Sequence, residues 1–160
     1  MRKQIIGEGH PTDRPADPSE LNIAAIARAL VSSEAAQHPI ENAFDSRRGP
    51  GGSRWVAAEP GEQTLILAFD IPQTIRQISL EVEEDEVSRT QELLLAVSHD
   101  GGRTYRELVR QEFNFSPPGT TFERENWSVM TEQVTHLRLW MNPDKGGRSC
   151  RTTLTSLTLQ

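Results

Sequence analysis

The chain has 160 residues, a length typical of one domain, and the 35% that are hydrophobic suffice for one core between two sheets. Its formal charge is −6, from 17 basic and 23 acidic side chains, so nucleic acid is not an expected partner. The single cysteine, Cys150, excludes an internal disulfide framework. No apolar stretch reaches the ~18 residues of a membrane span, and 1–18 lacks the apolar run of a signal peptide, so we expect a cytoplasmic protein.

The first part of the chain is expected to hold an arm, a short helix and a first strand. Residues 1–18 combine three prolines and two glycines with scattered charges, which is typical of a poorly ordered arm, and one domain is predicted over 19–160. Asp17-Pro18-Ser19-Glu20 carries helix-start signals and predicts a helix over Ser19 to Ala27. The same segment is also compatible with an extended chain, and Leu30 to Ser33 is assigned to a strand.

Beyond residue 60 the hydrophobic residues recur with a period of two, which is typical of β-strands. The predicted strands include Leu65–Phe69, Ile78–Val82, Leu93–Val97, Phe113–Phe115, Leu137–Met141 and Thr153–Leu159. Turn signals rich in glycine and proline separate them, and no long amphipathic helices alternate with them. The pattern therefore predicts an all-β protein, an antiparallel sandwich or jelly roll of about eight strands.

The polar loop from Gln37 to Ser53 holds the most ligand-like group of side chains. Arg47, Arg48 and Arg54 lie close to Trp55 in the sequence. Guanidinium groups bind carboxylates, phosphates or sugar hydroxyls, and an indole ring can stack on a flat apolar face. The alternative is a solvated loop beside a tryptophan that belongs to the core, because Trp55 begins a strand.

A second polar loop, from Asn142 to Arg148, adds further arginines to this hypothesis. Arg148 and Arg151 follow the sequence Asp-Lys-Gly-Gly. If both loops lie at one end of the sandwich, Arg47 and Arg148 would share a basic pocket on an otherwise acidic protein. This would be a binding site on loops held by a rigid scaffold.

Two other patterns have a structural as well as a functional interpretation. Ser98 to Tyr105 fits the pattern Ser-x-Asp-x-Gly-x-Thr-aromatic, and a single copy indicates a tight β-turn whose Ser and Asp bind local backbone N–H groups. The carboxylates from Glu81 to Glu86 could bind a cation, but a solvated strand end is the commoner reading.

Trp140 is the second tryptophan of interest, because it alternates with Leu139 and Met141 and so faces away from them. It is either an interface anchor beside Arg138 or a side chain that packs under the arm at 1–18. The four histidines have no metal-ligand spacing, and no nucleophile elbow or Cys–His pair is present, so neither an enzyme nor a cofactor is expected.

The order of these segments resembles the discoidin, or galactose-binding-like, family of β-sandwich modules (F5/8 type C). The resemblance rests on Glu41-Asn42-Ala43-Phe44-Asp45, Arg54-Trp55, the hairpin at Ser98 and the closing strand Leu154–Leu159. It implies a non-catalytic module that binds a carbohydrate through loops at one end. Arg54 to Phe69 also resembles the amino-terminal domain of the single-strand-break repair scaffold protein, which implies a protein-interaction or assembly module as the alternative.

The resemblance also raises the question of a structural calcium ion. Many family members carry a Glu in the last strand that helps to hold calcium, whereas this chain has Ser156 near that position. Asp45 alone would be a weak ligand for an ion that takes six to eight oxygens, although backbone carbonyls could contribute. No metal is therefore expected, and the expected partner is a glycan or a protein.

Overall fold

The computed structural model of the protein describes residues 19–45 and 47–160, so the predicted arm, Asp17 and Pro18 lie outside the described residues. The described chain is an antiparallel β-sandwich with one short α-helix, as the sequence predicted. Its elements are α1 (Ile23–Ile26), β1 (Ala27–Val31), the 3₁₀-helix η1 (Ile40–Ala43), β2 (Trp55–Val56), β3 (Gln63–Glu83), β4 (Arg89–Ser98), β5 (Arg106–Phe115), β6 (Phe122–Asn142), β7 (Thr153–Leu154) and β8 (Ser156–Leu159).

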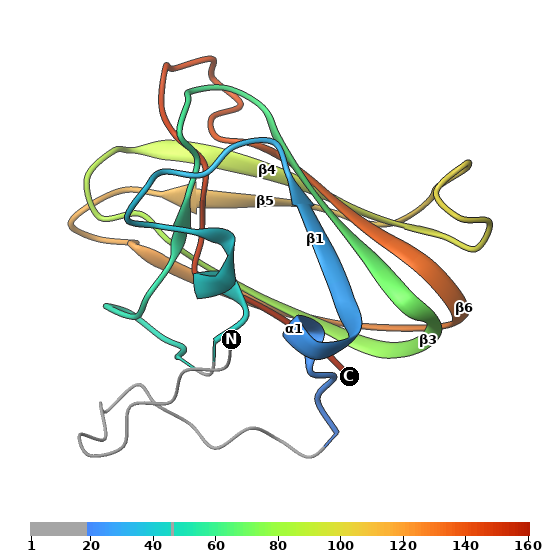
Figure 1. Ribbon diagram of the computed structural model, residues 1–160. Coiled ribbons are helices and arrows are strands. Elements are labelled where there is room, and N and C mark those ends of the chain that lie inside the picture. The colour runs from blue at the N-terminus through green and yellow to red at the C-terminus, as the bar shows by residue number, and fades with distance from the viewer. Residues whose placement is uncertain (1–18, 46) are drawn as a thin grey trace, which may run out of the picture.

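Two strands of 21 residues each, β3 and β6, run through both layers of the sandwich. They pair with each other along their length, and the register shifts between Ala68 and Gln77, where both strands bend from one layer into the other. Figure 1 shows this fold-over beside the labels β3 and β6. The strands predicted separately at Leu65–Phe69 and Ile78–Val82 are therefore halves of one strand, because irregular pairing interrupts the alternation without ending the ladder.

The bend divides the ladder into two layers. The larger layer has the order β1-β3-β6-β4-β5, and the smaller layer pairs β8 with the second half of β3, beside the first half of β6. The inward side chains of both layers form one connected core. Its largest fully buried members are Trp55, Phe113, Leu65, Leu67, Ile75, Ile78, Leu80, Leu93, Leu95, Leu137, Leu139 and Met141.

The start of the domain is more extended than predicted. Only Ile23–Ile26 is α-helical, and Ala27 already has extended backbone angles (φ −136°, ψ 154°) because it opens β1 opposite Phe69. Pairing with β3 thus overrides the local helix signals, and the first strand begins before Leu30. No helix in the described part of the chain is long and apolar enough to cross a membrane.

Trp55 is a core side chain, and its predicted role in ligand binding is wrong. It is 0% exposed, and its Nε1–H donates a hydrogen bond to the carbonyl of Ser33 at 3.0 Å. An indole enclosed in this way has no free face for stacking on a ligand. It joins the segment after β1 to β2 and therefore stabilises the sandwich.

We predict that Trp55→Phe lowers the free energy of unfolding by about 1–3 kcal/mol, because the Ser33 carbonyl loses its donor and the smaller ring leaves a void. Urea denaturation followed by fluorescence or circular dichroism would measure this. Trp140→Phe, at a half-buried position on the outer face, is the matched control and should change stability by about 0.5 kcal/mol or less. Equal effects of the two variants would contradict the assignment of Trp55 to the core.

Candidate functional site

The two arginine-bearing loops separate in space. β2 and β7 form a short antiparallel ladder in which Trp55 lies opposite Leu154 and Val56 opposite Thr153. The loop before β2 and the loop before β7 therefore leave this ladder in opposite directions. Arg48 lines hollows beside the smaller layer, whereas Arg148 lines a different hollow. The predicted basic pocket shared by Arg47 and Arg148 is wrong.

The loop before β2 is tied to its surroundings by polar contacts. Arg48 donates to both carboxylate oxygens of Glu20, at 2.7 and 2.6 Å, in a forked ion pair. Arg47 is exposed and its backbone N–H donates to Asp45, while the carbonyl of half-buried Arg54 accepts a hydrogen bond from Asn42. These arginines thus lie on one loop but do not converge on one hollow.

Carboxylates of the run at the end of β3 bind backbone N–H groups of this loop, which the sequence did not predict. Glu81 is 2% exposed; it accepts a hydrogen bond from the N–H of Gly49 at 3.0 Å and pairs with Arg124 at 3.2 Å. Glu83 accepts the N–H of Gly51 at 2.9 Å. Both glycines have positive φ, 86° and 79°, which lets their N–H groups reach the carboxylates. The start of the run is therefore an internal anchor and not a solvated strand end.

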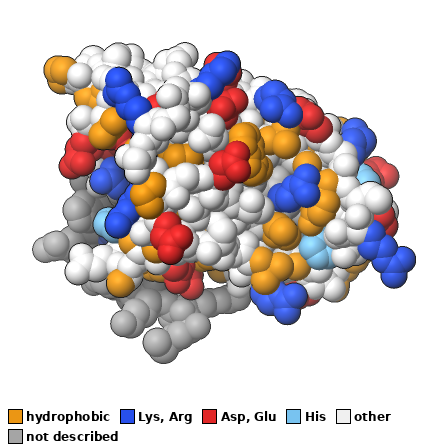
Figure 2. Space-filling view, turned by 90° about the horizontal axis from the view of Figure 1, so that it is seen from above, with side chains coloured by type: hydrophobic (Ala, Val, Ile, Leu, Met, Phe, Trp, Pro, Cys, Tyr) orange, Lys and Arg blue, Asp and Glu red, His pale blue; other side chains and the backbone are white. Residues whose placement is uncertain are grey.

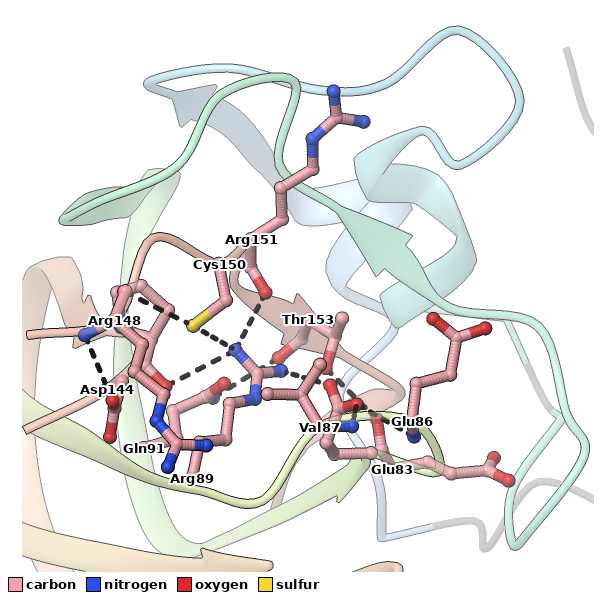
Figure 3. A network of polar contacts seen from close by, with 12 residues as sticks. Glu83, Glu86, Val87, Arg89, Gln91, Asp144, Arg148, Cys150, Arg151 and Thr153 are labelled. Carbon is pink, nitrogen blue, oxygen red and sulfur yellow. Dashed lines mark hydrogen bonds and ion pairs between the residues drawn. The ribbon is translucent and has the colours of Figure 1, made fainter. Parts of the chain in front are cut away.

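A second anchor, Arg89, lies under the loop between β6 and β7. Its side chain is 0% exposed and pairs with Glu84 at 2.8 Å. One Nη also donates to the carbonyl oxygens of Arg151, at 2.7 Å, and Pro143, at 3.2 Å (Figure 3). One guanidinium therefore fixes the turn before β4 and both ends of the loop before β7.

Asp144 and Arg148 shape the same loop from within. Asp144 accepts hydrogen bonds from the backbone N–H groups of Thr90 (3.2 Å), Gly146 (3.1 Å) and Arg148 (3.0 Å). Burial by itself raises the pKa of Asp144, but these three N–H groups and the charge of Arg148 outweigh it and hold the pKa below its usual value. Arg148 is exposed and donates one Nη–H to the carbonyl of Ser88 at 2.7 Å.

These groups border a hollow of about 360 Å³, which we call the loop-end pocket. It is lined by Ser88, Arg89, Thr90, Asn114, Phe115, Asp144, Gly146 and Arg148. The lining offers hydroxyl, amide, guanidinium and carboxylate groups, and Phe115, which is 3% exposed, belongs to the core beneath it. Nε of Arg89 is buried there and has no hydrogen-bond partner among the described residues. Such a set can both donate to and accept from a ligand rich in hydroxyl groups.

Solved structures that resemble this chain include sugar-binding modules. A family 32 module from Clostridium perfringens, in complex with GalNAc-β-1,3-galactose, has a TM-score of 0.60 at 19% identity, over 88% of this chain and 99% of that one. Another from the same organism, in complex with galactose, has a TM-score of 0.58 at 11% identity, over 88% and 96%. The chain has the fold of the family 32 carbohydrate-binding modules. A module of this fold in complex with 4,5-unsaturated mannuronic acid has a TM-score of 0.56 at 16% identity, over 84% and 95%.

The comparison confirms the predicted galactose-binding-like sandwich at the level of the fold. No protein-family model and no curated protein matches the sequence. The likeness therefore comes from the arrangement of the strands, and the ligand of this chain has to be argued from its own side chains.

The remaining predicted site residues lie away from the loop-end pocket. The side chain of Arg151 is exposed and extends away from the Arg89 network in Figure 3, so only its backbone carbonyl takes part. Arg138 and Trp140 lie on the outer face of the larger layer. Of the site residues predicted from the sequence, Arg148 lines the loop-end pocket.

Several members of the loop-end pocket were missed by the sequence analysis. Arg89 looks like an ordinary charge before a strand, and Asn114 like one polar position in the alternation of β5. One signal was available: Asp144 precedes Lys-Gly-Gly, a sequence that favours a turn closed by an Asp side chain. The burial of Arg89 depends on a loop that begins more than fifty residues later, and no local pattern reports it.

The residues near the position where the resemblance would place calcium offer few anionic oxygens. One oxygen of the Asp45 carboxylate accepts the N–H of Arg47 and the other accepts the hydroxyl of Ser53, so Asp45 is used within its own loop. The Ser156 hydroxyl faces that of Thr158, so neither supplies an anionic oxygen. The described residues contain no group of three or more His, Cys, Asp and Glu side chains that could hold a metal.

We predict that Arg89→Met lowers the free energy of unfolding by about 3–5 kcal/mol, because Glu84 and two backbone carbonyls lose their buried donor. Arg151→Met removes an exposed guanidinium from the same loop and should cost about 0.5 kcal/mol or less. Urea denaturation would measure both changes in the free energy of unfolding. In the Glu84→Gln background, Arg89→Met should lower the free energy of unfolding by less than it does in the parent. If the effects of the two substitutions are additive, the ion pair does not couple the two segments.

We predict that Asp144→Asn destabilises the protein at pH 7 by about 1–3 kcal/mol, because an amide nitrogen replaces one accepting oxygen. A pKa that folding lowers gives stability that is present above the unfolded value near 3.8 and is lost as the pH falls below it. The difference from the parent should therefore shrink as unfolding is measured from pH 7 down to pH 3. A difference that stays constant with pH would show that the charge of Asp144 contributes nothing.

Proposed function

We propose that this chain is a non-catalytic carbohydrate-binding module and that the loop-end pocket contacts the sugar. The observation that carries the proposal is the convergence of Arg148, Asn114 and Asp144 on one hollow at the loop end of a sandwich with the family 32 fold. Sugar hydroxyls need donors and acceptors at fixed positions, and the Arg89 network holds the strand ends and the loop that carry them.

The individual groups suit this role. A guanidinium has five N–H donors, and Arg148 uses one Nη toward Ser88, so further donors remain for a ligand. The carboxylate of Asp144 accepts three backbone N–H groups and has capacity for one more donor, such as a sugar hydroxyl.

Two features support binding without catalysis. Glycoside hydrolysis uses a pair of carboxyl groups, one of which keeps a proton through a raised pKa. The lining of the loop-end pocket has a single carboxylate, that of Asp144, and its pKa is lowered, so it stays ionised and has no proton to give. The alternative of a protein-assembly module stays a prediction, which a sizing column alongside the glycan experiment would address.

We expect hits on a glycan array, and Arg148→Ala should weaken binding of the best hit about tenfold in isothermal titration calorimetry. Arg151→Ala is the matched control, since it removes a guanidinium that points away from the pocket. Melting temperatures of both variants should stay close to that of the parent because both side chains are exposed. Unchanged binding in Arg148→Ala, or an array without hits, would contradict the proposal.

A further inference from the structure

The outer face of the larger layer carries a line of basic and aromatic side chains along its central strand. Leu137, Leu139 and Met141 point into the core, so their neighbours on β6 point outward. We call the outward set His136, Arg138 and Trp140 the β6 stripe. Figure 2 shows basic, acidic, histidine and hydrophobic side chains intermixed on the face that looks upward in Figure 1.

Trp140 stands beside a shallow hollow in this face. It pairs with Thr64 on β3 and with Leu94 on β4, and Leu94 pairs with Arg110 on β5. Together with Arg138 these residues line a hollow of about 390 Å³. The hollow crosses four adjacent strands of a hydrogen-bonded sheet, so its position is set by backbone pairing and not by loops.

Arg138 is the unusual charge on this face. Its guanidinium lies over the ring of Tyr105, 4.1 Å from the centroid, and no carboxylate of the described residues lies within ion-pair distance of it. By contrast, Arg110 pairs with Glu107 at 3.1 Å and Lys145 with Glu112 at 2.6 Å. A guanidinium held on an aromatic ring beside an indole, with no partner for its charge, is suited to a planar anion such as a carboxylate.

The position of Tyr105 is itself fixed by the hairpin at the end of β4. Asp100 accepts hydrogen bonds from the hydroxyl of Thr104 at 2.6 Å and from the N–H groups of Thr104 and Arg103 at 3.0 and 3.1 Å. These bonds, with that of Ser98, hold the pKa of Asp100 well below its usual value. The hairpin is thus the structural turn that the sequence predicted, and it places an aromatic ring under Arg138.

We propose that the β6 stripe is a second saccharide site, specific for sugars that bear a carboxylate. Trp140 stacks on a sugar ring in the hollow, and Arg138 binds the carboxylate. This rests on the proposed function only in assuming that saccharides are the ligands; it does not use the loop-end pocket. A protein partner fits less well, because protein interfaces have an apolar centre. Among the described residues on the outer face of the larger layer, Leu30 is the only large hydrophobic side chain that is markedly exposed, at 44%.

The probe is polygalacturonate, with its fully methyl-esterified form as the matched neutral polymer, tested by affinity gel electrophoresis and calorimetry. We expect the parent to bind the acid form, and both Arg138→Gln and Trp140→Ala to weaken that binding on the order of tenfold. Trp140→Phe should retain most of it, because a phenyl ring can still stack. Arg148→Ala should bind polygalacturonate within about twofold of the parent.

The outcomes separate the two sites. If Arg148→Ala loses polygalacturonate binding and Trp140→Ala keeps it, the polymer binds in the loop-end pocket. That result overturns this inference but agrees with the proposed function. Absence of binding in the parent, or equal binding of the methyl ester, also overturns it, whatever the glycan array shows. If the parent is dimeric on a sizing column and the Trp140→Ala variant is monomeric, the β6 stripe is an interface between copies. That result would also overturn this inference.

Discussion

The pairing of β3 with β6 is the constraint on which the other features of this protein depend. Both strands cross from the larger to the smaller layer, so one ladder sets the register of each layer. Side chains alternate across a sheet with a period of two, and a slip by one residue would exchange its faces. Leu139 would then face solvent and Trp140 the core. The outer face that carries the β6 stripe exists because this register is fixed.

The loop end depends on a different kind of interaction, the burial of Arg89. Burying a guanidinium is costly unless its charge is paired and its N–H groups are bonded, and Glu84 with two backbone carbonyls meets most of that requirement. In return, a polar loop with little apolar content is held in one arrangement. Asp144 then acts at shorter range by closing the turn that presents Arg148. A binding loop made of polar residues can therefore be as well defined as the strands beside it.

The strands were predictable from the sequence because their signal is local. Alternation at Leu137–Met141 reports one buried face, and the Ser98 hairpin is closed by bonds between residues at most four apart. The failures all involve partners that are distant in the chain. Trp55 is buried because Ser33 and β7 enclose it, and the run beginning at Glu81 is internal because a glycine loop lies on it. The single helix was overestimated for the same reason: pairing with Phe69 extends the chain at Ala27.

The charge of the whole chain is a poor guide to what its surface attracts. Several of the 23 acidic side chains are used internally: Glu20, Glu81, Glu84 and Asp144 each bind an arginine side chain or backbone N–H groups of the fold. At physiological ionic strength exposed charges are screened beyond about 8 Å, so a ligand in contact with the protein responds to the groups next to it and hardly to the net −6. On the outer face Arg138 is such a group, and no carboxylate of the described residues lies within ion-pair distance of it. An acidic protein can in this way present a cationic contact point, because several of its carboxylates hold its loops and do not surround that point.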